Sequence, residues 1–374
     1  MILHLTETYS LVVADAVDTD AYSFSLYPNR EQSRNALSNR LALVHDGLLD
    51  FEWHSPADLD GQWVIDDLGA RDVLRARTAD RADFFRTIYD ISPGTFLVPA
   101  SRPDRLAEAA RYAREAIDVL PDDAEVWATI PISRPSLTDP AVLMQLNQIH
   151  RQVSGIYLVV VDNAGFPAAW SEQELREYLR LVGAQVLSGR DVIAAHSDVR
   201  GLLAVAVGAS ELGTGVVKAM KQYGTPTGGG GAQPGQPPPS TQSYVAMPLL
   251  ATMHAGQAET VLGDQLKMIE SHNQSLPHCQ LDNVPPPGEA WAAWSDGEGN
   301  ANATRGIISA VGLAAAEEQL RQATDSADLM QEWLESAAAL AQDVPAEAFQ
   351  TAGLRAEVLA RPDVFNEARE SLGI

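Results

Sequence analysis

The sequence predicts an α/β fold, a (β/α)8 TIM-like barrel with a helical C-terminal extension. Short apolar, β-branched runs alternate with amphipathic helical stretches, which is typical of repeated βα units. Most of these runs are apolar throughout, as strands buried on both faces of a parallel sheet must be. The central runs recur about every 30 residues, a spacing that suits β/α repetition.

Eight runs are expected to be the strands of this barrel. They lie at residues 10–15, 47–53, 95–101, 125–131, 156–162, 191–197, 202–208 and 244–250. An open, doubly wound sheet is the alternative, but no GxGxxG motif follows the first run, which favours the barrel. The gap between the runs at 191–197 and 202–208 leaves room for only about one helical turn.

Helix signals stand between the runs and after them. Residues 103–120 form an amphipathic pattern with Pro103 in the expected first turn. Ser171 is followed three residues later by Glu174, a capping-box pattern that predicts a helix start. Ser326 and Pro362 mark two further helix starts near the end of the chain.

The chain divides into a barrel at residues 1–275 and a helical extension at residues 276–374. Residues 224–240, GTPTGGGGAQPGQPPPS, are expected to be a flexible insertion in a βα loop, because the strand-like YVAMPLL resumes directly after them. A domain linker is the other interpretation. The extension is expected to cap the barrel or to form an oligomer interface.

Composition and charge argue against a nucleic-acid-binding protein, a disulfide-bonded secreted protein and a membrane-spanning protein. The net charge is −24, and the basic residues are scattered among acids, which argues against a nucleic-acid ligand. The single cysteine, Cys279, excludes an intramolecular disulfide and indicates a reducing, cytoplasmic compartment. The first ten residues, MILHLTETYS, do not resemble a signal peptide, and no apolar run of ~18 residues predicts a membrane span.

Polar residues near the carboxyl ends of the predicted strands are the candidate site, because parallel α/β folds place catalytic groups there. The catalytic candidates are Asp15, Asp162, His196 and Glu211; the ligand-binding candidates are Ser133, Arg134, Gly208 and Gly213. Acids, an imidazole and a guanidinium around one mouth could support proton transfer or bind an anionic ligand. The competing interpretation is that these residues cap helices and satisfy turns.

Asp162 ends the clearest run, IYLVVVD, and is expected to point into the barrel cavity, because strand register fixes the direction of a side chain. The competing role for Asp162 is in a local turn with residues 163–165. No metal or cofactor is expected. His272, His278 and Cys279 lie near one another in sequence but lack the paired spacing of a zinc site.

The order of the βα units, the glycine-rich VGASELGTG at 207–215 and LPHCQLDN at 276–283 resemble the tRNA-guanine transglycosylase superfamily and its divergent relatives. The resemblance implies a (β/α)8 barrel, base-exchange chemistry by aspartates, a loop acid matched by Glu211, and a zinc site of the CxCxxC…H kind. The residues present do not fit that zinc site, because Cys279 is the only cysteine and Asp282 stands where a further one is expected.

Two functional hypotheses follow. In the first, the chain is a degenerate transglycosylase-like enzyme that acts on a nucleobase or nucleotide-like ligand, in a pocket that joins Asp162, His196 and Glu211. In the second, it is a non-catalytic scaffold that assembles with protein partners, or with itself, through the C-terminal helices. A filled mouth and an apolar patch on those helices would mark the scaffold.

Overall fold

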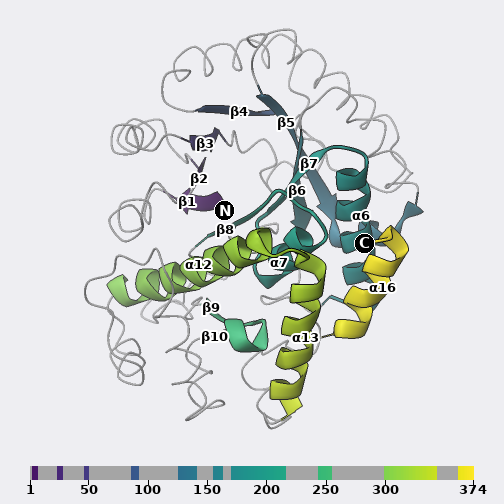
Figure 1. Cartoon of the computed structure of the whole chain (residues 1–374). Helices are drawn as coiled ribbons and strands as arrows, with labels where there is room; N and C mark the ends of the chain where they lie inside the picture. Colours follow the sequence, from purple (N-terminus) through teal and green to yellow (C-terminus); the bar gives the residue numbers. More distant parts are fainter. Residues whose placement is uncertain are drawn as a thin grey trace, which may run out of the picture.

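A computed structural model describes residues 2–6, 23–27, 46–49, 86–91, 125–140, 155–162, 170–215, 243–254, 299–342 and 361–374. At its centre β6 (Gly155–Val161), β7 (Asp191–Ala195) and β8 (Glu211–Gly215) form a parallel sheet (Figure 1). The described helices are α6 (Glu172–Leu187), α7 (Val199–Ala206), α12 (Gly299–Gln322), α13 (Ser326–Gln342) and α16 (Pro362–Leu372).

Backbone pairing continues on both sides of this sheet. On one side β5 (Glu125–Ser133) pairs with β6, and on the other β1 (Ile2–Thr6) pairs with β8. The short strands β2 (Ser23–Tyr27), β3 (Asp46–Leu49) and β4 (Arg86–Ile91) join β1 to β5 in chain order, so the parallel strand order returns to its start.

The (β/α)8 TIM-like barrel drawn from the sequence is nevertheless wrong. The described side-chain packing centres on the small β6–β7–β8 sheet and its five helices, and among the described elements the β/α alternation runs only from β6 through α6, β7 and α7 to β8. The described ranges contain no α-helix between β1 and β5. The candidate site is therefore not surrounded by eight repeated β/α units.

Two of the eight predicted strands are not strands of this sheet. Residues 202–208 belong mainly to α7, whose eight residues are all buried. Leucine and alanine favour a helix, and a short helix buried on every side has the same unbroken apolar sequence as a buried strand. Residues 244–250 form most of β9 (Ser243–Ala246) and the 3-10 helix η4 (Met247–Leu249), and β9 pairs antiparallel with β10 (Ala251–His254).

Other predicted elements fall outside the described residues. These are the runs at 10–15 and 95–101, the helix at 103–120, the loop at 224–240 and the domain boundary near 275. The predicted helix starts, in contrast, agree with the structure. Ser171 and Glu174 form both halves of the predicted capping box at α6, and Pro362 occupies the first turn of α16.

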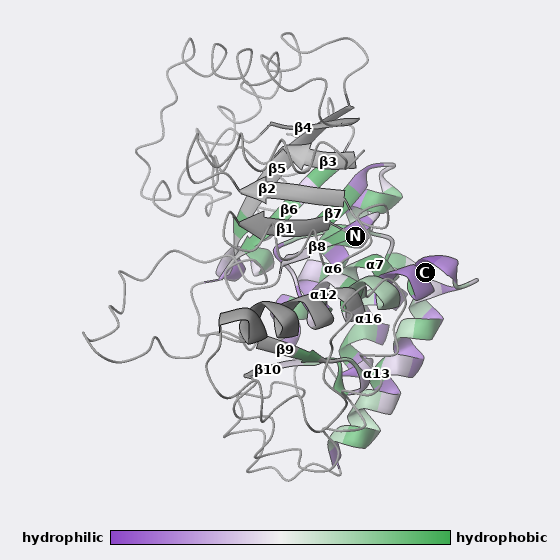
Figure 2. Cartoon of the chain, turned by 90° about the vertical axis from the view of Figure 1, so that its left-hand side faces the viewer, coloured by the Kyte–Doolittle hydropathy of each residue, from purple (hydrophilic) through white to green (hydrophobic). Residues whose placement is uncertain are grey.

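One hydrophobic core joins the sheet to the helices. Ile156 and Leu158 of β6 pack with α6 and α7, whereas Tyr157 and Val159 are buried on the opposite face, as strand alternation requires. Helix α12 packs on α7 and β8, α13 on α7, and α16 on α6 and α13. In Figure 2, α13 and α16 show mixed polar and apolar residues along their length, as expected of helices with one buried face.

A buried carboxylate ties α12 to the sheet. Glu317 accepts a 3.0 Å hydrogen bond from the backbone N–H of Leu212 in β8, and its carboxylate also lies 3.1 Å from Nη2 of Arg321. Burial raises the pKa of Glu317 above its ordinary value, and the nearby Arg321 offsets only part of this effect.

Candidate functional site

Asp162 and His196 come together at the carboxyl edge of the sheet. Asp162 directly follows β6 and His196 directly follows β7, and both side chains are buried. They line one pocket with side chains from α6, α7 and the segment before α6. The lining residues are Val160, Asp162, Trp170, Tyr178, Ala195, His196, Ser197 and Arg200. The enclosed space has room for about one water molecule.

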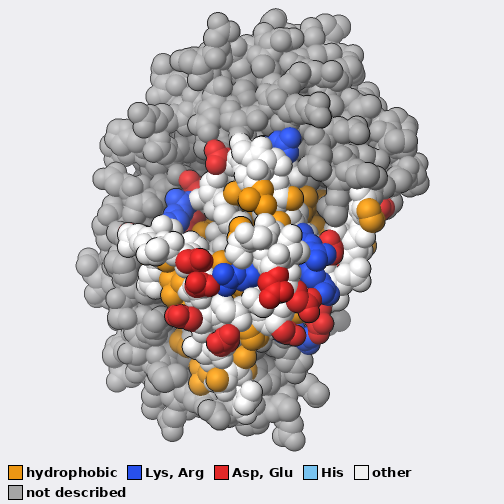
Figure 3. All heavy atoms as spheres, turned by 45° about the vertical axis from the view of Figure 1, so that its right-hand side comes forward, with side chains coloured by type: hydrophobic (Ala, Val, Ile, Leu, Met, Phe, Trp, Pro, Cys, Tyr) orange, Lys and Arg blue, Asp and Glu red, His pale blue; other side chains and the backbone are white. Residues whose placement is uncertain are grey.

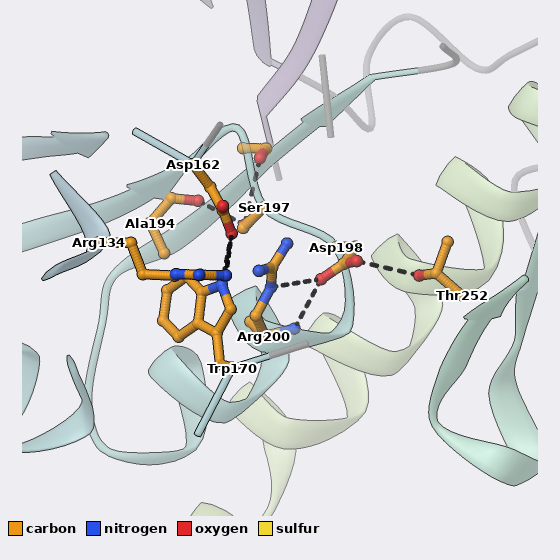
Figure 4. Close-up of polar contacts among 9 residues, drawn as sticks. Arg134, Asp162, Trp170, Ala194, Ser197, Asp198, Arg200 and Thr252 are labelled. Atoms are coloured by element: carbon orange, nitrogen blue, oxygen red, sulfur yellow. Dashed lines mark hydrogen bonds and ion pairs between the residues drawn. The ribbon is translucent and has the colours of Figure 1, made fainter. Parts of the chain in front are cut away.

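Hydrogen bonds from two side chains hold the Asp162 carboxylate. Its Oδ2 accepts a 2.9 Å bond from the indole Nε1–H of Trp170 and a 3.3 Å bond from Nη1 of Arg134 (Figure 4). Arg134, just after β5, also lies 3.2 Å from Oε1 of Glu174 in the first turn of α6. Arg134 thus bridges two carboxylates and joins the ends of β5 and β6 to α6.

Asp162 lies toward the helices. The pocket that it lines includes Tyr178 of α6 and Arg200 of α7, and Val160, two residues earlier, packs against the helix-side core. The expected direction, into a cavity enclosed by the strands, is therefore not the observed one. Side chains alternate between the two faces along a strand. Asp162 is an even number of residues after Ile156 and Leu158, which face the helices, so its side chain is on the same face. Residues 163–165 lie outside the described part of the chain.

The start of α7 supplies the cationic group of the pocket. Asp198 caps the helix, since its Oδ1 accepts hydrogen bonds from the backbone N–H (3.2 Å) and Nε (3.0 Å) of Arg200. Its Oδ2 accepts a 3.0 Å bond from the Thr252 hydroxyl of β10. The guanidinium carbon of Arg200 lies 4.6 Å from the ring centroid of Trp170, within cation–π range.

Within the Arg200 guanidinium, these contacts use only Nε. Arg200 is 6% exposed, and its Nη1 is buried with no hydrogen-bond partner among the described residues. A buried polar atom of this kind costs free energy until an acceptor reaches it. Figure 4 places the guanidinium of Arg200 between Asp162 and Asp198.

The backbone turns sharply between β7 and α7. His196 has φ 47°, in the left-handed region that residues other than glycine rarely adopt. The turn is held by Ser197, whose N–H donates to Gly213 O (2.8 Å) and whose hydroxyl donates to Ala194 O (2.6 Å). Strained residues of this kind concentrate at functional sites.

Tyr178 forms the inner wall of the pocket as a neutral phenol. Burial raises the pKa of Tyr178 well above its ordinary value, and the nearby Arg200 lowers it by less. Its ring meets that of Trp170 edge to face, with 5.3 Å between the ring centroids. Tyr178 therefore contributes packing here.

The remaining predicted residues lie elsewhere. Glu211 begins β8 level with Ile193, which pairs with Tyr157. Asp162 is five residues beyond Tyr157 along the strand direction. Glu211 therefore lies about 16 Å from the level of Asp162, toward the amino-terminal ends of the parallel strands. Gly208 lies between α7 and β8 with φ 106°, a turn requirement. Gly213 lies within β8 and bonds to Ser197.

The pocket therefore joins Asp162 and His196, with Arg134 beside them, but excludes Glu211 and Gly208. Ser133 ends β5, directly before Arg134, and Asp15 lies outside the described residues. Trp170 and Arg200 were missed as site residues. The signal for Arg200 is its position as the one charged residue inside a long apolar run, VRGLLAVAVGA.

No protein-family model matches the chain, and no curated protein matches it either. Within the described helices, none has both the length and the apolar character needed to cross a membrane. The described residues also contain no cluster of three or more potential metal ligands, and His272, His278 and Cys279 lie outside them.

The described surface is mixed in charge. In Figure 3 acidic and basic side chains are interspersed across the visible described face. Among described residues the large hydrophobic side chains that are exposed are Leu187 (61%) and Ile374 (41%). The described C-terminal helices therefore offer no broad apolar patch of the kind that the scaffold hypothesis requires, and that hypothesis stays a prediction.

Proposed function

We propose that this chain binds a small molecule at the carboxyl ends of β6 and β7 and catalyses proton transfer on it. Asp162 and His196 are the proposed acid–base pair. The observation that carries the proposal is that these two groups, from two different strands, line one pocket with a buried arginine that has a spare hydrogen-bond donor.

Three physical arguments support this assignment. A carboxylate and an imidazole are the side chains that most often exchange protons near neutral pH. The Asp162 carboxylate is oriented by Trp170 and Arg134, so its position is fixed before a ligand arrives. His196 is held in a costly backbone conformation by the bonds of the next residue, Ser197.

The transglycosylase resemblance makes nucleobases and nucleotides the first ligands to test. Glu211, the loop acid implied by that resemblance, is not part of the proposed pair, because it begins β8 at the level of Ile193. Because the pocket has room for about one water molecule, we propose that only one edge of a ligand enters it, between Asp162 and Arg200.

Ligand-detected NMR with a panel of nucleobases, nucleosides and nucleotides tests the proposal. The variants are Asp162→Asn and His196→Gln, and the control is Asp191→Asn, an aspartate at the opposite end of β7 that accepts a hydrogen bond from Ser210. We expect at least one ligand to bind the wild type and Asp191→Asn, and to bind Asp162→Asn at least about tenfold more weakly. Equal binding by all variants would exclude the pocket as the site.

A further inference from the structure

A chain of contacts runs from the β9–β10 pair to the candidate base. The Thr252 hydroxyl of β10 donates a 3.0 Å hydrogen bond to Oδ2 of Asp198, and Oδ1 of Asp198 accepts a 3.0 Å bond from Nε of Arg200 (Figure 4). The guanidinium carbon of Arg200 lies 4.6 Å from the Trp170 ring centroid, and the indole N–H of Trp170 donates to Asp162. These contacts connect Thr252, in a separate two-stranded sheet, to the residue that follows β6.

The Thr252 hydroxyl holds the second oxygen of the Asp198 carboxylate. Arg200 donates to Oδ1, with both its backbone N–H and its Nε. A carboxylate that is held at one oxygen can still rotate, because the last torsion of an aspartate side chain is broad. The donor on Oδ2 restricts this rotation, and the plane of the carboxylate in turn fixes the direction of the Arg200 Nε–H bond.

This chain of contacts is shielded from water. Its five side chains are between 1% and 6% exposed, so solvent is not at hand to replace a donor that is removed. A hydrogen bond to a charged group is also stronger in such surroundings than in water. Loss of the Thr252 hydroxyl should therefore let the Asp198 carboxylate turn, and the Arg200 guanidinium should move with it.

Resting on the proposed function, we infer that Thr252 is a positioning residue of the candidate site. Through Asp198 it sets the orientation of the Arg200 guanidinium over the Trp170 ring, and Trp170 in turn orients the Asp162 carboxylate. Thr252 does not line the pocket itself. The β9–β10 pair, which carries neither of the proposed acid–base residues, thereby helps to shape the site.

The indole N–H signal of Trp170 reports on this coupling without any ligand. It is assigned with Trp170→Phe in the ¹⁵N-labelled full chain. Thr252→Val removes the hydroxyl at nearly constant shape, and we expect it to move the Trp170 signal. Thr252→Ser keeps a hydroxyl and should return the signal toward its wild-type position.

Thr214→Val is the matched control. Thr214 of β8 is as deeply buried as Thr252, but its hydroxyl has no hydrogen-bond partner among the described residues. The same chemical change at Thr214 should therefore leave the Trp170 signal in place.

Two further variants test the route of the effect. Arg200→Lys keeps the charge but lacks the guanidinium plane, so in that background Thr252→Val should no longer move the Trp170 signal. Asp198→Asn weakens the hold on Nε of Arg200 and should move the signal by itself. It tests the middle of the chain even if the valine variant does not fold.

The ligand panel of the proposed function measures the effect on the site. We expect the nucleobases, nucleosides or nucleotides that bind the wild type to bind Thr252→Val about 2- to 30-fold more weakly, the range typical of residues that act on a site through others. Thr252→Ser and Thr214→Val should bind them as the wild type does.

The outcomes separate the positioning role from the proposed function. If Thr252→Val leaves the Trp170 signal where Thr214→Val does, or moves it equally in the Arg200→Lys background, Thr252 does not act on Trp170 through Arg200. If the signal responds but Thr252→Val binds the panel normally while Asp162→Asn binds it weakly, the positioning role is wrong and the proposed function stands. If no panel member binds the wild type, the proposed function and the positioning role are both overturned.

Discussion

The indole N–H of Trp170 donates a 2.9 Å hydrogen bond to the carboxylate of Asp162, eight positions earlier in the chain. Both residues are buried, so this bond and the one from Arg134 replace solvent around the carboxylate. The same indole supports the guanidinium of Arg200 on its face. One side chain thus orients both the candidate base and the candidate ligand-binding cation.

Trp170→Phe should lower the free energy of unfolding by about 1.5–3 kcal/mol, the usual contribution of a hydrogen bond to a charged group. Urea unfolding measures the loss. The control is the same substitution in an Asp162→Asn background, where the cost should be smaller because the charge is gone. An equal cost in both backgrounds would mean that the bond contributes nothing beyond packing.

Thr252→Val should destabilise the fold by ~1–3 kcal/mol, because Oδ2 of the buried Asp198 loses the hydroxyl that donates to it. Thr252→Ser keeps the hydroxyl and should stay closer to the wild type. Chemical unfolding of the three proteins is the measurement. If the valine and serine variants are equally stable, the bond from β10 to the α7 cap does not hold these elements together.

Glu317→Gln should change the pH dependence of stability. Because burial raises the pKa of Glu317, the folded state keeps its proton to a higher pH than the unfolded chain does. The stability contributed by this group is therefore present below the ordinary carboxyl pKa of about 4.3 and is lost as pH rises through the higher folded value. Glutamine does not ionise, so the Glu317→Gln variant does not lose this stability as pH rises.

Unfolding free energies measured across this pH range should show Glu317→Gln gaining on the wild type as pH rises. Glu318→Gln, at the exposed neighbouring position, is the matched control, and the gain with pH should be larger for Glu317→Gln than for Glu318→Gln. A Glu317→Gln difference that stays flat would contradict the raised pKa.

Gly201→Ala should cost about 1–3 kcal/mol in unfolding free energy. The added Cβ would overlap the Ser197 hydroxyl, which is fixed by its bond to Ala194, and would lie 2.8 Å from Cβ of Leu212. Gly183→Ala on α6 is the control, because the three atoms nearest to its new Cβ all belong to the Leu372 side chain and none to the backbone. If both alanine variants are equally stable in thermal unfolding, α7 can shift away from β8.

Local signals made part of the fold predictable. The runs at 156–162 and 191–197 coincide closely with β6 and β7, and the capping box of Ser171 and Glu174 begins α6. These features depend on neighbouring residues. They led directly to Asp162 and His196, because a residue that ends a parallel strand reaches the carboxyl edge of the sheet.

The rest depended on contacts that sequence spacing does not encode. The apolar run at 202–208 was predicted as a strand although it lies mainly in α7, and this error placed Glu211 at a strand end when it begins β8. Trp170 joins the site only through packing across elements, which no local pattern reports, and the lone charge of Arg200 in its apolar run does not say which residues it meets.

The bond from Leu212 to Glu317 spans 105 residues and sets an order of events during synthesis. At roughly 5–20 residues per second, the ribosome takes about 5–20 s to add the chain between them. For that interval the nascent β8 lacks the helix that accepts its N–H and covers its apolar side. The pocket-bearing sheet is thus completed only after translation has passed α12.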